Sequence, residues 1–168
     1  MKYIFFAVAV VLLFFLYQSS FILDIKSKVP CLVKQDPKSV LVLYLNLERA
    51  KERRASIEPL VKALGYRFER INAVDGKTLT SEEIQKNVDL EKFKQFRGRP
   101  PKAGEIGCFM SHYYALKKFL ESVEDVALIL EDDSTFDPKA LKSIIEEALK
   151  NQAFWDTLTF QSNHHGLP

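Results

Sequence analysis

Cysteine and histidine are scarce in this chain of 168 residues, which contains two cysteines and three histidines. Cys31 and Cys108 lie far apart in the sequence, which argues against a disulfide-stapled scaffold but leaves a single bridge open. No second histidine or cysteine stands at the spacing from His112 that zinc motifs use, so a zinc site is not predicted there. His164 and His165, near the end of the chain, are more typical of an exposed tail than of a ligand pair.

Several nucleotide-binding and hydrolase signatures are also absent. The chain has no G-x-G-x-x-G, no P-loop and no G-x-S-x-G motif, so hydride transfer, P-loop phosphoryl transfer and α/β-hydrolase chemistry lack their usual sequence support. The formal net charge is only +2, which gives no strong case for nucleic-acid binding. A hydrophobic content of 47% with 27% charged residues is typical of a globular protein.

One long apolar segment stands at the N-terminus. Residues 3–17 carry no charge, and apolar character resumes at residues 21–23, which gives nearly the ~20 residues that cross a bilayer. We therefore expect a transmembrane helix at residues 1–23, with a cleaved signal peptide as the alternative. Residues 24–39, with Pro30, Pro37 and scattered lysines, are predicted to be a juxtamembrane linker.

The side of the membrane follows from the lysines that flank this segment. More positive charges follow the segment than precede it, which favours the cytoplasmic side for the remainder of the chain. No Asn-x-Ser/Thr sequon is present, which agrees with that side. The lumen of the secretory pathway is the alternative location.

The rest of the chain alternates between strand and helix patterns. Strands are expected at residues 40–47, 66–73, 126–130 and 157–160. Helices are expected at residues 48–64, from the capping box formed by Thr80 and Glu83, at residues 104–121, and after Asp137. Pro59 should break or kink the first of them. This order predicts an α/β layered fold with a mainly parallel sheet.

The helix at 104–121 has two candidate buried faces. Its larger apolar side chains form one stripe: Ile106, Phe109, Tyr113, Leu116 and Leu120. Cys108, Ser111 and Ala115 form an adjacent line of small residues that would permit a close approach to a neighbouring strand. His112 leans towards the apolar stripe and is interpreted either as a hydrogen-bonded core histidine or as a residue that faces a site.

Three acids follow the strand at 126–130. Ligands bind at the carboxyl ends of strands in such sheets, and carboxylate oxygens suit Mg²⁺, Mn²⁺ or Ca²⁺. Strand alternation would point Glu131 and Asp133 to one side and Asp132 to the other, so the first two are the expected metal pair. The alternative is that these acids are solvated loop residues that precede a helix cap.

Four segments in order carry a family resemblance: LNLERAKERR (45–54), INAVDGKTL (71–79), GEIGCFMSH (104–112) and ALILEDD (127–133). Together they resemble glycosyltransferase family 25, which includes bacterial lipooligosaccharide and collagen galactosyltransferases, over about residues 40–160. The resemblance implies a GT-A-type, Rossmann-like domain that binds a nucleotide sugar, often UDP-galactose. It also implies Mn²⁺ or Mg²⁺, and a glycan or lipid-linked acceptor at a membrane.

The resemblance also implies roles for individual residues. Glu131, Asp132 and Asp133 would be the counterpart of the D-x-D metal motif. The implied nucleotide-sugar-binding residues are Asn46, Arg49, Asn72, Asp75, Ser111 and His112, the last two without a specific role. No catalytic base is identified. Residues 40–168 are expected to be the N-terminal part of a domain that is incomplete at its C-terminus, and a non-catalytic remnant is the alternative to an active enzyme.

Overall fold

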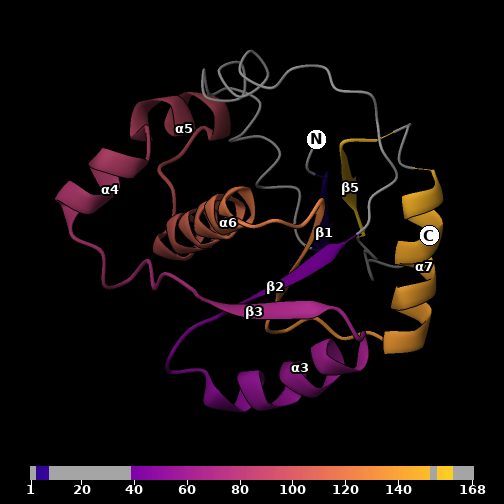
Figure 1. The fold of residues 1–168 in the computed structure, drawn as a ribbon. Helices are drawn as coiled ribbons and strands as arrows, with labels where there is room; N and C mark the ends of the chain where they lie inside the picture. The colour runs from indigo at the N-terminus through magenta and orange to yellow at the C-terminus, as the bar shows by residue number, and fades with distance from the viewer. Residues whose placement is uncertain (1–2, 8–38, 152–154, 161–168) are drawn as a thin grey trace, which may run out of the picture.

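The computed structural model describes residues 3–7, 39–151 and 155–160, which build a five-stranded sheet with the order β3-β2-β4-β1-β5 (Figure 1). Every strand pair in this sheet is parallel. The strands are β1 (Tyr3–Ala7), β2 (Val40–Asn46), β3 (Arg67–Asn72), β4 (Val126–Glu131) and β5 (Thr157–Thr159). The predicted α/β fold with a parallel sheet is confirmed.

Helices cover both faces of the sheet, as expected when each parallel strand requires a crossover connection. They are α3 (Lys51–Ala63), α4 (Ser81–Asn87), α5 (Leu90–Arg97), α6 (Ala103–Glu121) and α7 (Pro138–Lys150). Helices α3 and α7 pack on one face, and α6 packs on the other (Figure 1). The predicted caps at Thr80 and Asp137 are present, and each side chain accepts a backbone hydrogen bond.

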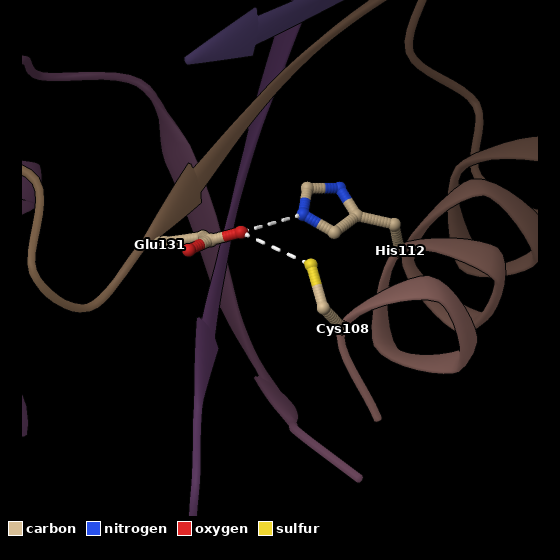
Figure 2. Close-up of side chains that lie close together, drawn as sticks. All are labelled: Cys108, His112 and Glu131. Atoms are coloured by element: carbon tan, nitrogen blue, oxygen red, sulfur yellow. Dashed lines mark hydrogen bonds and ion pairs between the residues drawn. The ribbon is translucent and has the colours of Figure 1, made fainter. Parts of the chain in front are cut away.

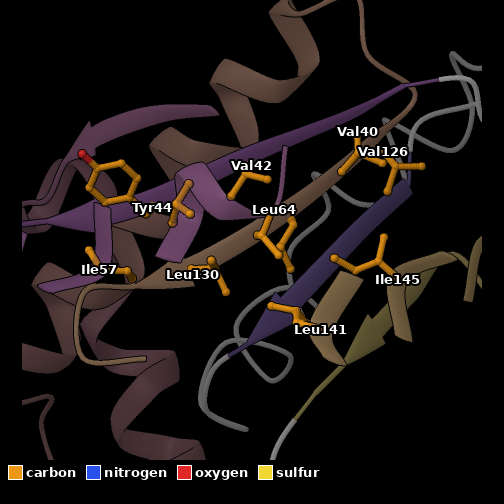
Figure 3. Close-up of a cluster of buried hydrophobic side chains, with 11 residues drawn as sticks. Val40, Val42, Tyr44, Ile57, Leu64, Val126, Leu130, Leu141 and Ile145 are labelled. Carbon is orange, nitrogen blue, oxygen red and sulfur yellow. The ribbon is translucent and has the colours of Figure 1, made fainter. Parts of the chain in front are cut away.

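The alternation of side chains explains why β2 and β4 are apolar throughout. In β2, Val40, Val42 and Tyr44 face α3 and α7, and the intervening leucines face α6. Figure 3 shows the first of these clusters, with Ile57 of α3 and Leu64, the residue that caps α3, beside Leu141 and Ile145 of α7. Because both faces are covered, no position in these strands favours a polar residue before the strand ends.

The N-terminal apolar segment differs from its prediction. Tyr3–Ala7 forms β1, which pairs with β4 and β5, rather than the start of a helix. An uncharged run of β-branched and aromatic residues suits a buried parallel strand as well as a membrane helix. Residues 8–38 lie outside the described part. Among the residues that the structure describes, no helix combines the length and apolar character that a bilayer span requires.

Helix α3 continues through Pro59, so of the predicted break or kink the break does not occur. Proline cannot donate a backbone hydrogen bond, so one bond of the helix is missing at this position. Ile57 and Val61, which flank the proline, are both buried against the sheet. Their packing holds both halves of the helix on the same surface.

Helix α6 buries its small-residue face, so the predicted large apolar stripe is wrong in part. Ser111, Ala115 and Phe119 are buried, whereas Tyr113 and Leu120 are exposed. The small side chains allow the helix axis to lie closer to the sheet than the stripe of large residues would.

Two glycines mark the closest approach of α6 to the loop after β3. A Cβ on Gly107 would lie 2.5 Å from the carbonyl oxygen of Val74 and 2.7 Å from the amide nitrogen of Gly76. A Cβ on Gly76 would lie 1.7 Å from the carbonyl oxygen of Ala103. Backbone contacts of this kind exclude any side chain at either position.

We expect Gly107→Ala to lower the free energy of unfolding by about 1–3 kcal/mol, the usual range for overpacking. Gly104→Ala is the matched control on the same helix, since a Cβ there meets nothing within 4 Å. That control should be neutral or stabilising by up to about 1 kcal/mol, because alanine favours helix. Urea denaturation of both variants tests the contact, and equal stabilities would contradict it.

Candidate functional site

The carboxyl ends of β2, β3 and β4 lie at one edge of the sheet, next to the first turns of α6. A cavity of about 230 Å³ opens there. Its lining comes from β2, β4, α3, α6 and the loops after the strands: Leu45, Leu47, Arg49, Arg53, Ala73, Val74, Asp75, Gly76, Lys77, Gly104, Cys108, Ser111, Glu131 and Asp132. A cavity therefore lies at the edge of the sheet where the sequence places its candidate site.

Glu131, the last residue of β4, faces two side chains of α6 (Figure 2). Its Oε1 lies 3.1 Å from Nε2 of His112 and 3.5 Å from Sγ of Cys108. His112 is fully buried, and Glu131 is partly exposed towards the cavity. One ligand-type atom from each of the three residues lies within 4.8 Å of the others.

The environment of Cys108 favours the neutral thiol. Burial raises its pKa to about 12, and the negative charge of Glu131 acts in the same direction. The thiol therefore keeps its proton at neutral pH and donates a hydrogen bond to the Glu131 carboxylate. Cys108 in this state is not a nucleophile, because the thiolate is the reactive form.

Asp132 points away from this group and is nearly buried, with 8% of its surface exposed. It accepts a hydrogen bond of 2.6 Å from the side-chain amide of Asn46 and forms a 2.9 Å ion pair with Arg53. The opposite orientations of Glu131 and Asp132 agree with strand alternation.

Asp133 lies beyond the end of the strand, and its predicted role as a metal ligand stays a prediction. Strand β4 ends at Glu131, and the amide of Ser134 donates to the Glu131 carbonyl at 3.0 Å, which closes a turn. Asp133 occupies that turn and is exposed. Within the described residues, the group of possible metal ligands contains Glu131 with Cys108 and His112, and does not contain Asp133.

Asn46 is 1% exposed and uses its side chain inside the protein. Besides Asp132, its amide donates to the carbonyl of Ala50 at 3.0 Å, and its Oδ1 accepts from Arg70 at 3.4 Å. The side chain thus ties the ends of three strands together. Its predicted contact with a nucleotide stays a prediction, and the bonds present favour a positioning role.

Arg49 and Asp75 form an ion pair across the cavity mouth. The backbone amide of Lys77 donates to Oδ1 of Asp75 at 3.1 Å, which holds the loop after β3 in place. Ser111 supports the same loop, since its hydroxyl accepts from the amide of Val74 at 2.8 Å. Asn72, at the end of β3, is exposed and lies outside the cavity lining.

Sequence reasoning missed Cys108 as a partner of His112. Residues four apart share one face of a helix, so the C-x-x-x-H spacing was the signal. The small side chain of Cys108 also suits close helix packing, and that interpretation hides its second use as a partner of His112. Lys77 was missed as well, and its position in a loop gave no periodic signal.

Comparison with known proteins identifies relatives of the chain. The family model described as Glycosyltransferase family 25 (LPS biosynthesis protein) matches residues 41–167. A glycosyltransferase 25 family member of Aedes aegypti is 32% identical over 145 residues, which covers 82% of this chain and 23% of that protein. Procollagen galactosyltransferase 2 of Homo sapiens is 29% identical over 124 residues, which covers 70% of this chain and 20% of that protein.

The chain spans about a fifth of the length of the curated relatives it matches, with 23%, 18% and 19% for the first three. No solved structure matches it significantly.

We expect Asp132→Ala and Asp133→Ala to differ in stability. Removal of the Asp132 carboxylate leaves one N–H of the buried Asn46 amide without its acceptor and should cost about 1–3 kcal/mol in the free energy of unfolding. The exposed neighbour Asp133 is the control, and its loss should change stability by less than about 0.5 kcal/mol. Chemical denaturation of both variants measures the difference, and equal values would refute the bracing role of Asp132.

Proposed function

Because the chain belongs to glycosyltransferase family 25, we propose that residues 40–160 bind the nucleotide-sugar donor of a galactosyltransferase. The observation that carries this proposal is the cavity at the carboxyl edge of a parallel sheet, where nucleotide ligands bind in folds of this class. The names of several relatives, procollagen galactosyltransferase, support galactose as the sugar and UDP-galactose as the donor. We propose a glycan or lipid-linked acceptor, and family membership supports the glycan.

The cations of the cavity suit a diphosphate. Three line it, Arg49, Arg53 and Lys77, beside the three acids Asp75, Glu131 and Asp132. Guanidinium groups bind phosphate oxygens through paired hydrogen bonds. The guanidinium groups of Arg49 and Arg53 are each held by a neighbouring carboxylate, Asp75 and Asp132 respectively. They are therefore oriented before a ligand arrives, which lowers the entropy cost of binding.

The volume of the cavity limits how much of the donor it holds. Pockets for complete small-molecule ligands usually measure about 300–1,000 Å³, and this cavity measures about 230 Å³. We propose that it receives the diphosphate region of the donor and leaves the remainder to surfaces that surround the opening.

The sequence resemblance implies Mn²⁺ or Mg²⁺ at Glu131, Asp132 and Asp133. Such an ion would neutralise charge on the departing nucleoside diphosphate. The donor set at Glu131 fits these ions poorly, since its two neighbours offer sulfur and nitrogen rather than oxygen. The chain's own residues orient the diphosphate through Arg49 and Arg53, and exclude water where Ser111 and Gly107 pack α6 against the loop after β3.

The proposed attachment to a membrane, with the sheet on the cytoplasmic side, stays a prediction from the sequence. The described residues do not test it, because residues 8–38 lie outside them.

We expect Arg53→Ala to weaken the binding of UDP by about tenfold or more, since a lost charge-assisted hydrogen bond is worth about 1.5–3 kcal/mol. Arg54→Ala is the matched control, because Arg54 pairs with Glu58 on the exposed side of α3 and does not line the cavity. Calorimetric titration of the full chain with UDP, and with uridine as the ligand that lacks phosphate, measures the effect. Equal losses of UDP affinity in both variants would contradict binding of the diphosphate in the cavity. An affinity for uridine equal to that for UDP would contradict it as well.

A transfer assay with UDP-galactose separates the proposed enzyme from its alternative. Release of UDP in the presence of a collagen peptide or a lipooligosaccharide acceptor would support the galactosyltransferase. Binding of UDP with no release in either case would favour the non-catalytic donor-binding protein instead.

A further inference from the structure

We propose that Cys108, His112 and Glu131 bind one transition-metal dication of the zinc type at the inner end of the cavity. The three side chains come from one face of α6 and from the end of β4, and they converge on a common point (Figure 2). The inference deepens the proposed function and rests on it for the role of the ion in catalysis. Binding of the ion itself can be measured without any transfer reaction.

The two distances from Glu131 to the other ligand atoms lie close to the edges of a coordination tetrahedron, and all three atoms lie within 4.8 Å of one another. Zinc binds sulfur at about 2.3 Å and nitrogen or oxygen at about 2.0–2.1 Å, so tetrahedral ligand atoms stand about 3.3–3.6 Å apart. Oε1 of Glu131 lies 3.1 Å from Nε2 of His112 and 3.5 Å from Sγ of Cys108. Small changes in side-chain torsion are sufficient to admit an ion between the three atoms.

The chemistry of the donors selects the kind of ion. Thiolate and imidazole are ligands of zinc, cobalt and iron, whereas magnesium and calcium require oxygen. The neighbouring carboxylates do not complete an oxygen site, because Asp132 pairs with Arg53 and Asn46, and Asp133 lies exposed in the turn. On binding, the Cys108 thiol releases its proton to solvent and a sulfur–metal bond replaces the S–H bond.

Three protein ligands leave a fourth position for an outside oxygen. Catalytic zinc sites have this composition, whereas structural sites use four protein ligands. Cys108 and Glu131 both line the cavity, so the open position faces the space assigned to the donor diphosphate. A phosphate oxygen or a water molecule is the ligand that this position would take.

The scaffold holds the ligands in place before an ion arrives. Cys108 and His112 lie on successive turns of α6, and Gly107 next to them is locked against the loop after β3 by backbone contact. His112 is fully buried, and Glu131 is fixed at the end of a central strand. Rigid elements of this kind position metal ligands more accurately than loops do.

The competing interpretation is a hydrogen-bonded group without an ion, in which Glu131 accepts from both Cys108 and His112. Cobalt(II) distinguishes the metal site from the hydrogen-bonded group. A thiolate ligand gives a sulfur-to-cobalt charge-transfer band in the near ultraviolet, and tetrahedral cobalt absorbs in the visible region. The full chain is treated with a chelator, titrated with Co²⁺ and then with Zn²⁺. We expect both absorptions to appear at one equivalent of Co²⁺ and to vanish as Zn²⁺ replaces it.

Single-residue variants show which side chains give rise to the cobalt absorption bands. Cys108→Ser should abolish the charge-transfer band, and His112→Asn should weaken cobalt binding at least tenfold. Asp133→Ala is the control, because it removes the exposed acid that an oxygen-based site would need. It should leave the spectrum unchanged. Far-ultraviolet circular dichroism confirms that each variant retains its secondary structure, and Cys108→Ala replaces the serine variant if that one does not fold.

The proposal is overturned if wild type shows no charge-transfer band, or if the band persists in Cys108→Ala. It is also overturned if Asp133→Ala removes cobalt binding. UDP binding is measured on the same samples, so that failure of the metal assignment can be told apart from failure of the proposed function. If the band is absent but UDP still binds in an Arg53-dependent manner, the donor site stands and only the metal assignment fails.

Discussion

The contact between the backbone of α6 and the loop after β3 is the constraint on which the site depends. Gly107 and Gly76 leave no room for a side chain between the two segments, so the first turns of the helix lie directly over the carboxyl edge of the sheet. Ser111 then reaches the loop backbone, and Cys108 and His112 reach the end of β4. With a wider separation, the helix would still cover the core but would contribute nothing to the cavity.

Glu131 and Asp132, two adjacent carboxylates at the carboxyl edge of the sheet, have different partners. Glu131 points towards α6, where it meets a thiol and an imidazole, and Asp132 points towards α3, where it meets Arg53 and Asn46. The first carboxylate is available for an ion, and the second keeps a cation and an amide in place. Like charges next to each other in the chain are tolerated because each has its own partners on opposite faces of the sheet.

Family membership and geometry support the same ligand by independent routes. Glycosyltransferases of this family use an activated sugar, and the cavity combines pre-oriented guanidinium groups with a cluster of metal-ligand atoms. A diphosphate requires both kinds of charge compensation when it departs from the sugar. The part of the protein that selects the acceptor is a separate question, since the chain spans about a fifth of the length of its curated relatives.

From β2 onward the sequence alone determined the order of strands and helices, apart from α5, together with the buried strands β2 and β4, the helix caps and the position of acids at a strand end. These features follow from local patterns of apolar residues and capping groups, which act over a few neighbouring residues. Only the tertiary structure decided which face of α6 is buried, and that Glu131 meets Cys108 and His112. Those outcomes depend on how closely two segments far apart in sequence can approach, and on where β4 ends.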